Sequence, residues 1–347
     1  MDARELTAPV PLTGPDGTLN PDAVGWARHP LVETGGIGRR VNDTGRVVSW
    51  GRNKRWEYWN IITPTHVLAA TVSSIDYAAV HEVWVLERPT RFEIAKAATV
   101  IPARGVELPP RLDAGPARAR AKDLEIDIDP LGPLVEGAAG RVRLRARIPR
   151  ARFDVTITRP AGHECLAAVV PWSEKRFQYT VKDVALPAAG TVTIDGVVHE
   201  VPAGESWAVL DHGRGRWPYD VRWNWGAGSG ISRGRTIGLQ VGGQWTRGTG
   251  QTENGLVIDG VLHKIHTELD WDYDPADFLR PWRISGGGLE ASFTPLYDKT
   301  SGTDLVVLSS RTHQLFGSWA GSLTVPNGDV VAFDGIDGWA EDVHNRW

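Results

Sequence analysis

Short runs of alternating apolar and polar residues, separated by turn residues, recur along the whole chain. Long apolar patterns with a period of 3.6 residues are missing, so helices should be few and short, such as turns in PADFLRPW at 275–282. Glycine (39 residues) and proline (23 residues) are spread throughout, which suits many tight connections. The pattern predicts an all-β protein made of many short antiparallel strands, arranged as barrels or sandwiches.

Three dipeptides mark tight hairpins between alternating runs. Asp195-Gly196 separates TVTI from VVHEV, Asp259-Gly260 separates LVI from VLHKI, and Asn327-Gly328 separates SLTV from VVAF. We expect a two-residue turn at each, because both central residues of such a turn need positive φ. The near-repeat of IDGVVH (194–199) and IDGVLH (258–263) indicates either two related β units or the shared sequence of good hairpin tips.

Two of the expected strands carry charge along one face. In DLEIDID (123–129) acidic residues alternate with leucine and isoleucine, and in RVRLRAR (141–147) four arginines alternate with apolar residues. We expect the two strands to pair antiparallel, with acids opposite arginines on a solvated face. A row of arginines that binds anions is the alternative.

Composition narrows the class of protein. The 347 residues fit one large domain or two of ordinary size, and the net charge of −4 offers no basic excess for nucleic acid. No apolar run approaches the roughly 20 residues of a membrane helix, and no secretory signal stands at the N-terminus. With Cys165 as the single cysteine, these features predict a cytoplasmic protein.

The 16 tryptophans are the unusual feature of the composition, and the stretch DHGRGRWPYDVRWNWGAGSG (211–230) concentrates them beside glycines. On a strand, Trp223 and Trp225 share one face, and in KRWEYWN Trp59 lies on the face opposite Trp56. Aromatic side chains suit the lining of a barrel interior that holds an apolar ligand. Packing in a hydrophobic core is the alternative for each of them.

Several landmarks resemble an actinobacterial family of unknown function, in order along nearly the whole chain: NKRWEYWNIITPTHVLAATVSSIDY, GRGRWPYDVRWNWG, TENGLVIDG and DGIDGWAEDVHNRW. More distantly, the chain is similar to carotenoid hydratase and other double-lipocalin proteins. This resemblance implies two consecutive lipocalin-like antiparallel β domains, which we expect at 1–205 and 206–347.

The distant resemblance also implies an acid. Carotenoid hydratase carries a His-Asn-Trp-Gly run and, about one hairpin later, a Tyr-x-Asp pair whose Asp is the proposed acid. The matching run here is WNWG, with Trp223 where that family has histidine. Glu253 in TENG corresponds to the acid, although the tyrosine is missing. Burial beside tryptophan raises the pKa of a carboxyl, which would keep such an acid protonated.

Further candidates come from the same stretches. Asp211 and His212 form a second candidate acid–base pair, or else hydrogen-bond the glycine-rich turn. Arg214 and Arg216 either hold a ligand oxygen or form structural salt bridges. The residues expected to bind the ligand are Trp217, Tyr219, Trp223, Trp225, Asn254, Arg214, Arg216 and Trp59.

Other polar residues are expected to be unrelated to the site. His263 and His266 should face opposite ways on a strand, which disfavours a metal pair, and Glu341, Asp342 and His344 are expected on the surface. Neither a phosphate-binding glycine loop nor a CxxC or HExxH motif occurs, so we expect no metal and no organic cofactor.

These residues favour a cofactor-independent acid–base enzyme that acts on a hydrophobic, isoprenoid-like or polycyclic small molecule by hydration, dehydration, isomerisation or cyclisation. A binding protein that holds such a molecule unchanged is the first alternative. A carbohydrate-active enzyme is the second, because tryptophan platforms and paired carboxylates also suit sugars. The sequence does not fix the oligomeric state.

Overall fold

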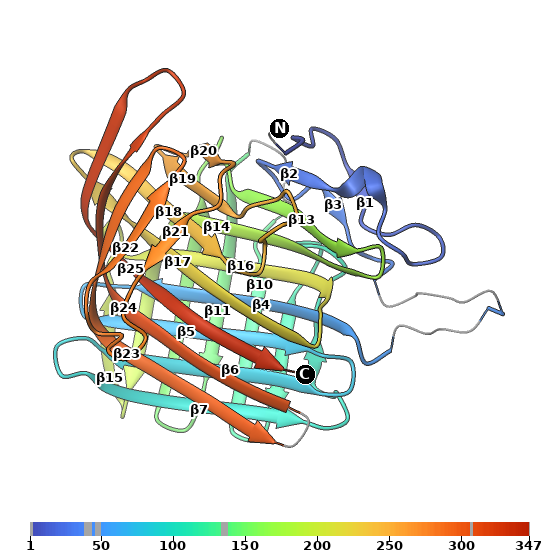
Figure 1. Ribbon diagram of the computed structural model, residues 1–347. Coiled ribbons are helices and arrows are strands. Elements are labelled where there is room, and N and C mark those ends of the chain that lie inside the picture. The colour runs from blue at the N-terminus through green and yellow to red at the C-terminus, as the bar shows by residue number, and fades with distance from the viewer. Residues whose placement is uncertain (1–2, 38–43, 46–49, 133–137, 306–307, 347) are drawn as a thin grey trace.

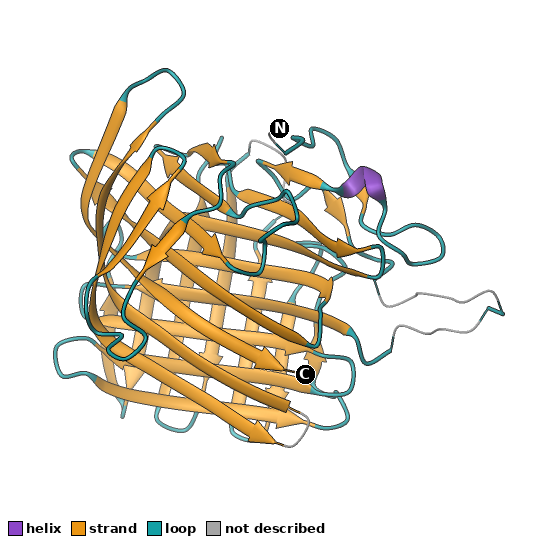
Figure 2. Cartoon of the chain, viewed as in Figure 1, coloured by secondary structure: helices purple, strands orange, loops and turns teal. Residues whose placement is uncertain are grey.

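The computed structural model describes residues 3–37, 44–45, 50–132, 138–305 and 308–346, and almost all of its regular structure is β-strand (Figures 1 and 2). Within these ranges one short 3-10 helix occurs, η1 (Pro21–Ala23). The segment 275–282 forms successive turns before its last residue enters a strand. The predicted all-β class is therefore confirmed. No helix in the described ranges is long and apolar enough to cross a membrane.

The first sheet has 14 strands among the described residues and bends back across itself at β14 (Arg176–Ile194). One arm, which we call the front arm, contains β2 (Gly25–Ala27), β4 (Asn53–Ile62), β5 (His66–Ser74), β6 (Ala79–Glu87), β7 (Phe92–Val100), β13 (Leu166–Ser173) and β16 (Trp207–Arg216). The other, the rear arm, contains β8 (Val106–Glu107), β9 (Ala117–Ala121), β10 (Leu124–Pro130), β11 (Gly140–Arg147), β12 (Ala151–Arg159) and β15 (Val197–Val201). Strands of the two arms run in crossed directions (Figure 2).

The second sheet has nine strands in the described part of the chain, in the order β20-β19-β18-β17-β25-β24-β23-β22-β21. Their bounds are β17 (Asp220–Ser232), β18 (Arg235–Gly243), β19 (Asn254–Ile258), β20 (Val261–Ile265), β21 (Asp270–Asp272), β22 (Trp282–Gly286), β23 (Leu289–Leu305), β24 (Leu308–Thr324) and β25 (Val330–Arg346). A separate parallel pair joins β1 (Val10–Pro11) to β3 (Val32–Glu33). The two large sheets are antiparallel and curled, as predicted.

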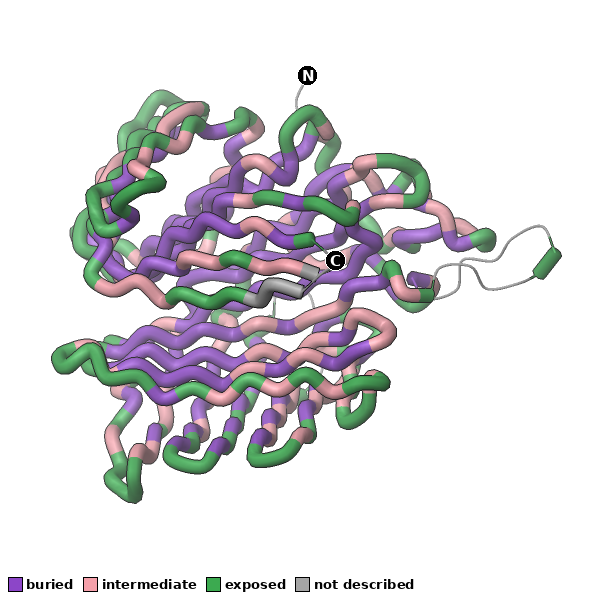
Figure 3. The backbone as a smooth tube through the Cα atoms, turned by 60° about the horizontal axis from the view of Figure 1, so that its bottom comes forward, coloured by how far each residue is buried: buried purple, intermediate pink, exposed green. Residues whose placement is uncertain are grey.

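Strand alternation creates three apolar layers. One core lies between the front and rear arms and includes Leu68, Ile126 and Val155. A second fills the curled second sheet around Trp319. The third joins the front arm to the second sheet, where Trp84 stacks on Phe316 with ring centroids 5.1 Å apart. Buried residues follow the middles of the strands, whereas hairpin tips are exposed (Figure 3). The front arm is thus buried on both faces.

The chain passes from the first sheet to the second at residues 217–219, between β16 and β17. β16 lies within the expected second unit (206–347) but pairs with β4 and β14 of the first sheet. The change of sheet therefore falls after the expected boundary at 205, and the division into two domains stays a prediction.

The hairpin predictions hold with one correction. Asp195-Gly196 and Asp259-Gly260 form two-residue turns in which both residues have positive φ. Asn327-Gly328 also lies in a hairpin, but β24 ends at Thr324 and β25 starts at Val330, so the connection is longer. Of the two residues only Gly328 has positive φ, and the Val325 N–H donates a hydrogen bond to Asp329 O at the base of the loop.

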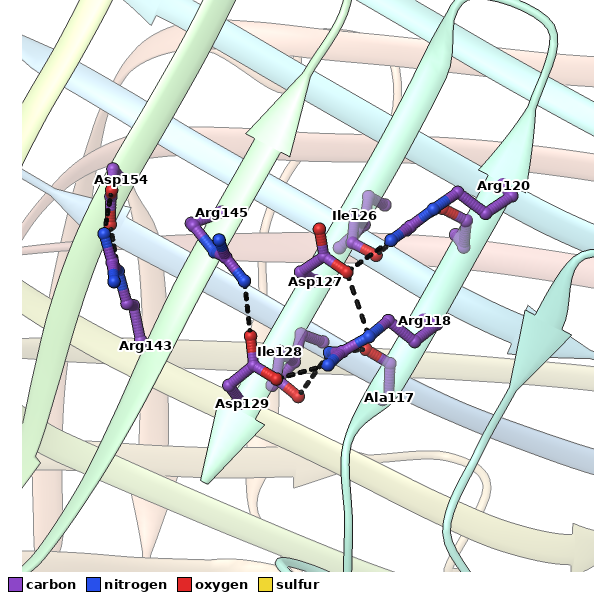
Figure 4. Close-up of polar contacts among 11 residues, drawn as sticks. Ala117, Arg118, Arg120, Ile126, Asp127, Ile128, Asp129, Arg143, Arg145 and Asp154 are labelled. Atoms are coloured by element: carbon purple, nitrogen blue, oxygen red, sulfur yellow. Dashed lines mark hydrogen bonds and ion pairs between the residues drawn. The ribbon is translucent and has the colours of Figure 1, made fainter. Parts of the chain in front are cut away.

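The charged strands pair as predicted, with β10 antiparallel to β11 and acids opposite arginines. β9 adds two more arginines to the same face. Figure 4 shows the ion pairs Arg145–Asp129, Arg143–Asp154, Arg120–Asp127, and Arg118 with both Asp127 and Asp129. Arg147 pairs with Glu125 on the same face. Because these arginines already contact carboxylates, the ladder supports sheet pairing rather than a row of arginines that binds anions.

The bend of β14 is fixed by a buried charge cluster. The register of β14 against β16 shifts between Asp183 and Leu186, and Ala185 in the bend has φ of 58°. The fully buried Asp183 carboxylate accepts a 2.7 Å bond from Arg159 and contacts His163 Nε2 at 2.9 Å. Although burial alone would raise the pKa of Asp183, the charges of Arg159 and His163 lower it below its ordinary value.

Replacing Asp183 tests the importance of this bend. Asp183→Asn removes the 2.7 Å counter-charge of the buried Arg159 guanidinium and leaves only the longer 3.4 Å contact with Asp113, so we expect a loss of about 3 kcal/mol in the free energy of unfolding. Because the folded-state pKa of Asp183 is lowered, its stabilisation is present at neutral pH and lost as the pH falls through that pKa. Urea unfolding at several pH values measures both effects.

Asp195→Asn is the matched control, since Asp195 pairs with Arg150 on the surface at a hairpin tip. We expect its melting temperature to equal that of the wild type. Equal stabilities for the two variants at neutral pH would show that the bend does not depend on the Asp183 cluster.

Candidate functional site

A cavity of about 500 Å³ lies between the front arm of the first sheet and the second sheet. It is thus bounded on one side by β4, β5, β14 and β16, and on the other by β17, β24, β25 and the connection between β18 and β19. Five tryptophans line it: Trp56, Trp217, Trp223, Trp225 and Trp245.

Four of these tryptophans pack against one another around Trp217 and so form an aromatic wall. Trp217 stacks on Trp245 with ring centroids 5.8 Å apart and planes 10° apart. Its ring also meets Trp56 and Trp223 edge-on, each at 5.6 Å between centroids. Since each ring is held by its neighbours, the wall is set before any ligand binds.

Each of three carboxyl groups in the cavity accepts a hydrogen bond from the indole N–H of a different tryptophan. The pairs are Trp56 with Asp211 (3.0 Å), Trp245 with Glu253 (2.6 Å) and Trp223 with Glu341 (2.8 Å). All three carboxylate-bearing residues are buried. We refer to Asp211, Glu253 and Glu341 together as the acid cluster.

Lys182 supplies a positive charge within the acid cluster. Its Nζ lies 3.0 Å from Asp211 Oδ1, 3.6 Å from Glu253 Oε2 and 3.9 Å from the centroid of the Trp225 ring. Burial lowers the pKa of Lys182, but the charges of Asp211 and Glu253 outweigh it, so the pKa is raised overall. Lys182 is therefore an ammonium ion that neutralises one of three carboxylates.

Burial shifts the pKa of the other two carboxyl groups upwards, towards protonation. Burial raises the pKa of Glu341 to about 7, although the Trp223 hydrogen bond and the Lys182 charge pull it down. Burial likewise raises the pKa of Glu253 against the charge of Lys182. Near neutral pH the cavity thus holds a carboxylic acid that can donate a proton and, in Asp211, a carboxylate ion-paired with Lys182.

Two glycines make room for these groups. A Cβ at Gly213 would lie 2.1 Å from Trp56 Cζ2, and one at Gly242 would lie 2.4 Å from Glu253 Cγ. The tryptophan and the glutamate therefore rest directly on backbone of β16 and β18. This close approach explains the glycines at position 213 in GRGRW and position 242 in VGGQW.

The structure brings together five of the residues singled out in the sequence: Glu253, Asp211, Trp217, Trp223 and Trp225 all line the cavity. His212 does not, because adjacent residues on β16 face opposite sides of the sheet. Its buried ring lies against Tyr179, and its Nδ1 is 3.5 Å from Glu57.

The other expected ligand contacts lie outside the cavity lining. Arg214 donates to the carbonyls of Trp56, Gly213 and Pro109, and Arg216 donates to Asn53 Oδ1 and to the carbonyls of Gly17 and Ile37.

The remaining three residues are also placed elsewhere. Asn254 accepts from Gly242 N and donates to Thr267 O. Trp59 is 1% exposed in the core between the two arms, and Tyr219 is 47% exposed.

Sequence reasoning missed Glu341 and Lys182 and did not single out Trp56 and Trp245 as ligand contacts. Glu341 was expected on the surface and is 6% exposed instead, because the C-terminal strand β25 lies at the centre of the second sheet. The sequence pattern correctly placed Trp56 and Trp59 on opposite faces of one strand. That alternation could have identified Trp56 as a cavity residue once Trp59 was assigned to the core. Among the described residues, no group of three or more histidine, cysteine or acidic side chains is arranged to hold a metal ion.

Comparison with known proteins identifies a family and a fold. The model of a domain of unknown function, DUF2804, matches residues 3–347. No curated protein matches the chain.

Among solved structures, a candidate AttH protein from Nitrosomonas europaea is 10% identical with a TM-score of 0.50, covering 84% of this chain and 92% of its own. Kievitone hydratase from Nectria haematococca is 13% identical with a TM-score of 0.48, covering 86% and 91%. The AttH likeness agrees with the predicted double lipocalin-like architecture.

The raised pKa of Glu341 predicts a pH-dependent stability. Unfolded, the carboxyl titrates near 4.5, whereas in the folded chain it titrates near 7. Its contribution is therefore fully present below pH 4.5 and is lost as the pH rises through 7, by an amount on the order of 3 kcal/mol. We expect Glu341→Gln to abolish this fall in urea-unfolding free energy.

Infrared difference spectra of the same two proteins provide a direct measure. The protonated-carboxyl band that Glu341→Gln removes should titrate with a midpoint near pH 7. A midpoint near the ordinary glutamate value would mean that burial does not shift this group.

Proposed function

The chain belongs to the DUF2804 family, and because that family's description names no function, we propose one from the cavity itself. We propose an enzyme that acts on a hydrophobic small molecule by proton transfer: hydration, dehydration, isomerisation or cyclisation. The observation that carries the proposal is Glu341, a buried acid with a pKa of about 7 in a tryptophan-walled cavity, beside the ion-paired carboxylate of Asp211.

In the proposed reaction Glu341 is the general acid. It donates its proton to an alkene carbon or to a hydroxyl oxygen, which then leaves as water with the electrons of the C–O bond. The carbocation that forms faces the rings of Trp217 and Trp225. Contact with such rings stabilises a cation by about 0.5–2 kcal/mol each.

Asp211 is the proposed base. Its carboxylate takes a proton from the carbon next to the cation, and the electrons of that C–H bond form the new double bond. The net change is a shifted double bond after alkene protonation, or loss of one water after hydroxyl protonation. The Lys182 ammonium lies 3.0 Å from Asp211 Oδ1, and its positive charge is thus next to the proposed base.

Glu253 is the second proposed acid. Its pKa is also raised by burial, and its Oε1 accepts the Trp245 hydrogen bond. Its Oε2 is buried and has no hydrogen-bond partner among the described residues. A substrate hydroxyl or a donated proton would satisfy that oxygen, which supports a polar role towards a ligand.

A non-catalytic binding protein for a hydrophobic ligand is the second candidate. It is favoured by the fact that every carboxyl of the acid cluster already accepts an indole hydrogen bond. Such bonds can serve to shape a cavity without any chemistry.

Turnover distinguishes the two functions. The purified protein is incubated with an extract of bacterial metabolites, and small molecules that are retained or changed are identified by mass spectrometry. For the compound found, we expect Glu341→Gln to lower kcat by about 10²- to 10⁴-fold, because a general acid is lost, with KM nearly unchanged. Glu253→Gln tests the second acid in the same assay.

Glu205→Gln, an exposed glutamate in a turn before β16, is the control and should retain full activity. Wild type and Glu341→Gln that retain the same unaltered compound would refute catalysis and leave the binding protein. Conversion by wild type with retention of the substrate by the variant supports the enzyme.

A further inference from the structure

Charge is distributed unevenly along the cavity. The acid cluster carries three carboxyl groups against the single ammonium of Lys182. Three other cations line the same cavity: Lys54 and Arg55 from β4 of the first sheet, and Arg346 from β25 of the second. The cavity therefore has an acidic part and a basic part.

The strand register separates these two parts. Asp211 pairs with Tyr58 on β4, and Lys54 precedes Tyr58 by four residues, or about 13 Å of strand. On β25, Arg346 follows Glu341 by five residues, or about 17 Å. Because five is an odd step, its side chain leaves the other face of the strand, and Arg346 lines the cavity from the exposed end of β25. Both sheets thus place a cation at a similar distance from the acid cluster and towards the same edge of the molecule.

That edge is the mouth of the cavity. Ile75, Tyr77 and Ile101 line the cavity there, at the ends of β5, β6 and β7, and Ile101 is 73% exposed. The C-terminal end of β25 reaches the same side of the molecule (Figure 1). A ligand that enters past this lip passes the cations before it reaches the acid cluster.

The charges at the mouth are held in place. The Lys54 ammonium lies 5.3 Å from the Tyr77 ring centroid. Burial lowers the pKa of Lys54 to about 8 against the charge of Asp76, so the group is still mainly protonated at neutral pH. The Oδ2 atom of Asp76 accepts bonds from Gly51 N and Asn53.

Arg346 is more accessible than Lys54. Its Nε donates a 3.1 Å hydrogen bond to Ser309 Oγ, and it forms no ion pair with a described residue. Ser310 also lines the cavity beside it. The guanidinium therefore has donors left for a ligand, and hydroxyl groups stand next to it.

We propose that the substrate is an elongated apolar molecule with a carboxylate or equivalent oxyanion at one end, held at the mouth by Lys54 and Arg346, with its reacting part at the acid cluster. This rests on the proposed function of the cavity and adds the class and orientation of its substrate. At the inner end the ammonium of Lys182 is already ion-paired with Asp211, so an anion there gains no free cation. At the mouth it gains charge-assisted hydrogen bonds. The reverse orientation is thereby disfavoured.

Binding of a matched pair of probes tests this. All-trans-retinoic acid and its methyl ester share one elongated apolar skeleton and differ in charge, and quenching of tryptophan fluorescence reports their binding. We expect the wild type to bind the acid at least about tenfold more tightly than the ester. Lys54→Met and Arg346→Met should each weaken the acid by roughly three- to tenfold and leave the ester unchanged.

Controls separate charge at the mouth from other causes. Lys175→Met removes an exposed lysine outside the cavity lining and should bind both probes as wild type does. Arg346→Lys keeps the charge and should retain most of the preference for the acid. Melting temperatures establish whether Lys54→Met is folded. Arg346→Met changes an exposed strand end, so it tests the role of charge at the mouth even if Lys54→Met does not fold.

The outcomes are distinct from those for catalysis. A wild type that binds acid and ester equally, or binds neither, overturns the substrate assignment whatever Glu341→Gln does to turnover. If the preference for the acid is retained in Glu341→Gln and lost in Lys54→Met with Arg346→Met, the mouth binds the anion independently of the acid chemistry.

Discussion

The buried ion pair between Asp183 and Arg159 holds the bend of β14, on which both the fold and the cavity depend. Before the bend, β14 belongs to the front arm and supplies Lys182 to the cavity; after it, the strand joins the rear arm. In the bend itself, Ala185 N donates to Ser229 Oγ of β17 at 2.8 Å. The bend in β14 thus brings the two arms together around the first core and positions the Lys182 ammonium. It also connects the first sheet to the second through a hydrogen bond.

The indole hydrogen bonds explain how three carboxyl groups can share one cation. An indole N–H satisfies a carboxyl oxygen but brings no charge, so it does not offset the negative charge as an arginine would. Lys182 does so at the shortest distances, and it lies closest to Asp211. Burial then leaves protonation as the least costly state for a further carboxyl, as the raised pKa of Glu341 indicates.

Local patterns predicted local features well. Turn residues predicted the hairpins at 195–196 and 259–260, and two-residue periodicity predicted the β10–β11 ladder. Both signals lie within a few neighbouring residues of the sequence. Part of the candidate cavity lining was predicted: Trp223 and Trp225 from one motif, and Glu253 from the resemblance. Lys182 and Glu341 come from strands that meet only when the two sheets pack, and no periodicity encodes that contact. His212 was chosen because it adjoins Asp211 in sequence, but on a strand adjacency means opposite faces.

The division of the cavity between two sheets bears on how such a protein changes over evolution. Lys54 and Lys182 belong to the first sheet, whereas Glu341 belongs to the second sheet and Glu253 to the connection just before its strand β19. The chain passes from one sheet to the other at residues 217–219, between β16 and β17. A crossover between related genes within that short connection would exchange the residues at one wall and leave the other wall intact. New pairings of substrate anchor and proton donor can therefore arise by recombination in one step, without passing through point mutations in a packed core.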